Sequence, residues 1–103
     1  MAIKKRYSRN KTECKVTFTL KKEFAKGFHT ISLVGDFNNW HGGENIFVET
    51  ESDGSYTTNI ILHANKSYQF RYLGDGVNWF NEIEADDEVN SYFEGFKNSV
   101  IVV

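Results

Sequence analysis

Short runs in which apolar and polar residues alternate recur along the chain. Val16, Phe18 and Leu20 alternate with polar neighbours over residues 15–21, which is typical of a strand with one buried face. Similar patterns predict further strands at residues 30–34, 46–48, 56–62, 68–72 and 99–103. No long window keeps apolar residues at the spacing of a helix face, so few helices are expected.

Turn-forming residues separate these runs. Asp53 and Gly54 predict a hairpin, because such a pair supplies the positive φ angles that tight turns need. Residues 80–98 have no regular pattern and are expected to form an irregular, acidic segment. About seven or eight short strands at this spacing predict an all-β fold, an antiparallel β-sandwich. A small closed barrel is the alternative.

The length and composition limit the kind of protein. The chain has 103 residues and one cysteine, Cys14, so we expect a single domain without an internal disulfide. It is too short for an α/β barrel or a two-domain nucleotide-binding enzyme. The N-terminus lacks the apolar stretch of a signal peptide, and no apolar run is long enough to span a membrane. We therefore expect a cytoplasmic protein with no membrane partner.

Charge is distributed unevenly. Residues 1–26 carry nine basic and two acidic residues, and residues 27–103 carry three basic and twelve acidic ones. Residues 1–13 are interpreted as a basic N-terminal arm or first strand, and residues 14–103 as the sandwich domain. A basic arm would suit nucleic acid or an acidic partner. We favour a strand with a positive outer face, because the basic residues continue along an alternating strand. Nucleic acid is not expected as a partner, since the aromatic-rich part of the chain is acidic.

The residues give no support for metal binding or for catalysis. The acidic loop lacks the spacing of a calcium-binding EF-hand and is expected to be a solvated surface loop, with no metal site. Its acidic residues are Glu82, Glu84, Asp86, Asp87 and Glu88. No catalytic residues can be assigned, because neither an opposed carboxylate pair nor a nucleophile arrangement is recognisable. We expect a protein that is not an enzyme and uses no cofactor.

Two tryptophans give the strongest sign of a binding surface. Trp40 ends a polar turn after a predicted strand, and Trp79 follows the turn at residues 74–76. Neither belongs to an alternating apolar face, and large aromatic side chains in turns often mark interaction surfaces. Each could instead fold back as a cap on the core. A sugar ring suits such a surface, because its C–H face packs on an indole while its hydroxyls need hydrogen-bond partners.

The motifs around these tryptophans resemble those of a known family. Residues 34–40 read Val-Gly-Asp-Phe-Asn-Asn-Trp and resemble the hallmark turn of glycogen- and starch-binding modules of the isoamylase early-set type. Such modules occur in the β subunit of AMP-activated protein kinase and before the catalytic barrel of branching and debranching enzymes. The resemblance continues through residues 68–76, 81–86 and 98–102, although Ile83 stands where the family often has proline. It implies an immunoglobulin-like sandwich.

The resemblance also implies a set of sugar contacts. Trp40 and Trp79 would be the stacking platforms, and Arg71 falls where the kinase module has a hydrogen-bonding lysine. Asn98 matches the sugar-binding asparagine of the closing strand, and Glu94 aligns with a leucine that contacts sugar. The implied ligand is an α-1,4-glucan such as glycogen or starch, bound without catalysis. The alternative is a protein-interaction domain that docks onto a glycogen-metabolising enzyme or another partner and has lost sugar binding. The oligomeric state stays open.

Overall fold

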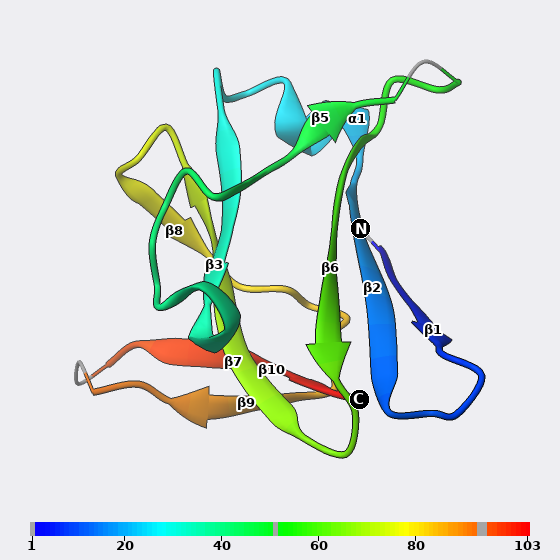
Figure 1. Cartoon of the computed structure of the whole chain (residues 1–103). Coiled ribbons are helices and arrows are strands. Elements are labelled where there is room, and N and C mark those ends of the chain that lie inside the picture. The colour runs from blue at the N-terminus through cyan, green and yellow to red at the C-terminus, as the bar shows by residue number, and fades with distance from the viewer. Residues whose placement is uncertain (1, 51, 93–94) are drawn as a thin grey trace.

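The structure, a computed structural model, describes residues 2–50, 52–92 and 95–103. Its described strands form two antiparallel sheets that lie against each other (Figure 1). One sheet has the strand order β1-β2-β6-β5, and the other has the order β4-β3-β7-β10-β9, with β8 also paired to β7. The prediction of an all-β antiparallel sandwich is therefore confirmed.

The four-stranded sheet consists of β1 (Ala2–Tyr7), β2 (Glu13–Leu20), β5 (Val48–Glu49) and β6 (Tyr56–His63). The six-stranded sheet consists of β3 (Ile31–Gly35), β4 (Asn45–Ile46), β7 (Ser67–Gly74), β8 (Asn78–Phe80), β9 (Asp87–Asn90) and β10 (Lys97–Val102). The helical elements are α1 (Lys22–Ala25) and the 3₁₀ turn η1 (Asp36–Asn38).

The core between the sheets follows from alternation along the strands. Val16, Phe18 and Leu20 of β2 are completely buried, as their spacing predicts. From the opposite sheet, Phe70 and Tyr72 of β7 meet Phe18 edge to face, with ring centroids 5.3 and 6.5 Å away. Edge-to-face contacts of this kind add stability beyond simple burial. The face of β7 that carries residues 69 and 71 must consequently point away from the core.

The prediction of a single strand at residues 46–48 is wrong, because this run is divided between two strands. Asn45–Ile46 (β4) pairs with β3 in one sheet, whereas Val48–Glu49 (β5) pairs with β6 in the other. Phe47 lies at the crossing and is only 5% exposed. Its ring packs 5.5 Å from that of Tyr72, and its N–H donates to the carbonyl of Ile31. Burial of one large ring thus breaks the strand and transfers the chain between sheets.

The described part of the acidic segment at residues 80–98 is also more ordered than its pattern predicts. It contains β9, and Glu82 is only 3% exposed instead of lying on a solvated loop. The Glu82 carboxylate accepts a 2.7 Å bond from the Tyr72 hydroxyl and a 2.9 Å bond from the N–H of Glu84. The N–H of Glu82 donates to Oγ of Ser99 at 2.9 Å. The buried carboxylate of Glu82 therefore fastens this loop to β7, and its backbone N–H fastens the loop to β10.

A second aromatic cluster holds β8 in place. The ring of Phe80 lies 5.3 Å from that of Phe24 and 5.1 Å from that of Phe28. Gly74 allows this packing, because a Cβ there would come within 2.7 Å of Phe28. Since side chains alternate along a strand, anchoring Phe80 inward directs Trp79 to the outer face.

We predict that Tyr72→Phe destabilises the fold by about 1–3 kcal/mol, because the buried Glu82 carboxylate loses a hydrogen-bond donor. Burial, followed by the charge of Glu82, raises the pKa of Tyr72 far above its ordinary value, so this hydroxyl remains a donor at any working pH. Urea denaturation of both proteins measures the change. Tyr68→Phe is the matched control, since it removes a hydroxyl that bonds the His63 carbonyl at an exposed position. Equal losses in the two variants would contradict the role given to Glu82.

Candidate functional site

A groove of about 780 Å³ crosses the outer face of the six-stranded sheet. Trp40, Arg71, Trp79 and Asn98 all line it, so four of the five residues singled out in the sequence meet at one place. The fifth, Glu94, lies outside the described residues. These residues are distant in the sequence but close in space, because β7 pairs with β3, β8 and β10 in the sheet.

Trp40 is held at one end of the groove by the turn that follows β3. Its backbone has a φ of 59°, a left-handed conformation that is rare for a large side chain. Its N–H donates to the carbonyl of Gly35 at 2.9 Å, and its indole Nε1–H donates to Oδ1 of Asp36 at 3.0 Å. Oδ2 of Asp36 accepts from the N–H of Gln69 at 2.8 Å. Asp36 thus joins the indole directly to β7.

Gly35 and Asn38 make this turn fit against the sheet. A Cβ at Gly35 would lie 2.5 Å from the carbonyl oxygen of Gln69, so only glycine allows the close approach. Asn38 is 5% exposed, accepts from the N–H of Gly35 and donates to the carbonyl of Leu33. Such a satisfied buried amide fixes the turn in one conformation.

A row of polar side chains forms the floor of the groove. The β7–β10 register places Ser99 opposite Phe70, which brings Asn98 beside Arg71. Oδ1 of Asn98 accepts from Nε of Arg71 at 2.7 Å, and its Nδ2 donates to Oε1 of Gln69 at 2.9 Å. Asn98 is 8% exposed, so it mainly orients its two neighbours. The two Nη groups of Arg71 remain as donors for a ligand, since no described residue accepts from them.

Aromatic rings flank the guanidinium of Arg71. Its Cζ lies 6.0 Å from the ring centroid of Trp79 and 5.8 Å from that of Phe96, both within the range of cation–π attraction. Burial lowers the pKa of Arg71, although a guanidinium still stays charged at neutral pH. Trp79 is 45% exposed and Phe96 60% exposed, so both rings present surface to a ligand.

The loop between β9 and β10 supplies residues that sequence reasoning missed. Tyr92 and Phe96 line the groove, and the carbonyl of Phe96 accepts bonds from both N–H and Oγ of Ser91. These bonds close the base of the loop and hold Phe96 near Arg71. Trp79 follows the turn, as expected, and lies in β8 opposite Leu73. The resemblance pointed to this loop through Glu94, and the aromatic residues beside it were the signal that could have identified Tyr92 and Phe96.

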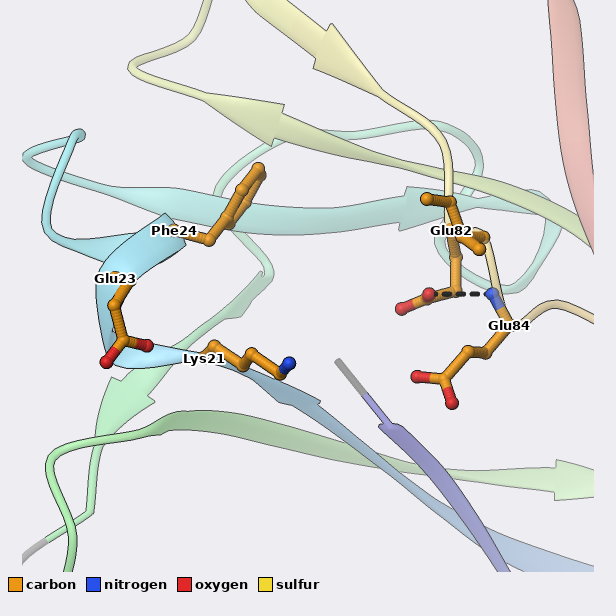
Figure 2. A pocket seen from close by; sticks show the side chains of 6 residues that line it. Lys21, Glu23, Phe24, Glu82 and Glu84 are labelled. Atoms are coloured by element: carbon orange, nitrogen blue, oxygen red, sulfur yellow. Dashed lines mark hydrogen bonds between the residues drawn. The ribbon is translucent and has the colours of Figure 1, made fainter.

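A smaller pocket of about 340 Å³ lies elsewhere, between α1 and the loop after β8. Figure 2 shows Phe24 and Lys21 on one side of it, facing Glu82 and Glu84 on the other. Both carboxylate oxygens of Glu82 already accept hydrogen bonds from Tyr72 and Glu84. The carboxylate of Glu82 in this pocket is thus already used to anchor the loop after β8. The groove is therefore the better candidate for a ligand.

The described residues contain no group of three or more His, Cys, Asp or Glu side chains placed to hold a metal ion. No helix in the described ranges is long and apolar enough to cross a membrane.

No known family model matches the chain, and a search of curated proteins also finds no match. The geometry of the groove consequently carries the functional argument.

We predict that Asp36→Ala loosens Trp40 selectively, because the indole loses its acceptor and β7 loses the Asp36 link. The indole proton of Trp40 should exchange faster with solvent, and the free energy of unfolding should fall by about 1–2 kcal/mol. Indole resonances in a ¹⁵N NMR spectrum, assigned with Trp40→Phe, report the exchange. The Trp79 resonance is the internal control. Unchanged exchange at Trp40 would mean that Asp36 does not position the ring.

Proposed function

We propose that this chain binds α-1,4-linked glucans such as glycogen or starch in the groove, without catalysing a reaction. The observation that carries the proposal is the shared position of Trp40, Trp79 and Phe96 around a floor of polar side chains on an open sheet face. Flat apolar rings lie beside the Nη donors of Arg71, from which no described residue accepts a hydrogen bond. This arrangement matches a sugar, whose C–H surface packs on rings and whose hydroxyl edge accepts hydrogen bonds. The motif resemblance in the sequence supports the same ligand class.

Hydrogen bonds from the floor of the groove would orient a bound sugar more than they would strengthen its binding. A bond from an Nη group of Arg71 to a sugar hydroxyl replaces one to water, so its net contribution is modest. Asn98 and Gln69 hold the guanidinium at a fixed position, which reduces the ordering cost of binding. Stacking on the rings then supplies most of the affinity, at roughly 25 cal/mol for each Å² of apolar surface removed from water.

The groove contains charges that suit a neutral ligand. The carboxylate of Asp36 is engaged by Trp40 and Gln69, and the positive charge of Arg71 faces aromatic rings. A neutral glucan needs no further charge compensation. We place this activity in the cytoplasm, since a chain with a single cysteine suits a reducing compartment.

We predict that Trp79→Ala and Trp40→Ala each weaken maltoheptaose binding about tenfold, because a lost ring contact is worth about 1–2 kcal/mol. Isothermal titration calorimetry at two salt concentrations measures the affinity. The wild-type affinity should hardly change with salt, since a neutral sugar releases no counterions.

Tyr7→Ala is the matched control, because it removes an exposed aromatic residue from β1 in the other sheet. Its affinity should equal that of the wild type. If both tryptophan variants bind as tightly as the wild type, the sugar platform is refuted. Docking onto a glucan-metabolising enzyme or another protein would then become the leading function.

A further inference from the structure

The basic first strand, β1, leaves one of its edges unpaired in the part of the chain that the structure describes. It pairs with β2 in the register Arg6–Lys15 and Lys4–Thr17, and no other described strand pairs with it. In Figure 1, β1 forms the outermost strand of the four-stranded sheet. The strand has six residues, and the backbone groups of alternate residues along it can bond a further strand.

The ladder shows which backbone groups are available. The N–H of Ala64 donates to the carbonyl of Thr12, so even-numbered residues of β2 direct their backbone groups to β6. Odd-numbered residues of β2 then face β1, and antiparallel alternation leaves Ile3, Lys5 and Tyr7 with groups that point outward. An added strand would bond to these three residues.

The outer surface of the same strand carries unbalanced positive charge. Arg6 lies directly opposite Lys15, and Lys4 lies one step along the same face. Like charges directly opposite on neighbouring strands are destabilising. No described carboxylate forms an ion pair with any of these three residues, whereas Lys5, which points the other way, is paired with Asp86 at 2.8 Å. An anionic partner would relieve this repulsion.

We infer that the edge of β1 binds an extended acidic segment of a partner protein, which adds to the four-stranded sheet as a further strand. Acidic side chains at alternate positions would lie beside Lys4 and Arg6, while its backbone bonds to Ile3, Lys5 and Tyr7. A second copy of β1 is a poor occupant, because its own Lys4 and Arg6 would face these same charges. This surface belongs to the other sheet from the groove, so the inference is independent of glucan binding.

The test measures binding of a fluorescent peptide in which Glu alternates with Val and Thr, by fluorescence anisotropy with the full chain. Lys4→Gln/Arg6→Gln should weaken binding about tenfold, since two charge contacts are lost. Lys5→Pro should also weaken it about tenfold, because proline removes an outward N–H but no ladder bond to β2. Lys5→Ala is the matched control, as it removes the same side chain and the ion pair with Asp86 while keeping the N–H.

A peptide with methylated backbone nitrogens tests strand addition from the partner's side and does not depend on the folding of Lys5→Pro. It should bind at least about tenfold more weakly than the unmodified peptide. Equal binding of the two peptides would overturn the inference, as would equal binding by Lys5→Pro and Lys5→Ala. Tighter binding of a single-stranded oligonucleotide of equal charge would also overturn it, in favour of nucleic acid.

Discussion

The antiparallel pairing of β7 with β10 is the constraint on which the groove depends. It places Asn98 beside Arg71 and Gln69, two neighbouring residues of β7 that lie far from Asn98 in the sequence. A shift of one residue would either move Asn98 to the core face or bring Phe70 and Tyr72 to the outer face. The burial of those two rings against Phe18 therefore fixes the register, and the register fixes the groove floor.

The walls of the groove depend on local anchors on either side of this floor. Asp36 and Gly35 seat the turn that presents Trp40, and the Phe24–Phe28–Phe80 cluster orients β8 and Trp79. Glu82 fastens the loop that leads from β8 to β9. Polar residues that are buried and satisfied thus give the site its shape, while exposed rings supply its contact surface.

The alternation of apolar and polar residues was enough to predict the sandwich and the buried face of β2. A strand that is buried on one side has an apolar residue at every second position. This alternation also separated Arg71 from the inward face of β7, and the turn motif singled out Trp40. It failed at Phe47, where a tertiary contact with Tyr72 divides one apolar run between two sheets. It failed again at Glu82, whose burial rests on a hydroxyl ten residues away and on Ser99. Phe96 joins the site only through its nearness to Arg71, which no local pattern encodes.

The central claim is that a sugar chain lies across the groove and touches rings and floor together. A ¹⁵N NMR titration of the wild-type protein with maltoheptaose tests it most directly. We expect both indole resonances and the Arg71 Nε–H resonance to shift along one binding curve, while the amides of β1 stay unchanged. Shifts confined to other surfaces, or no shifts at saturating sugar, would contradict it.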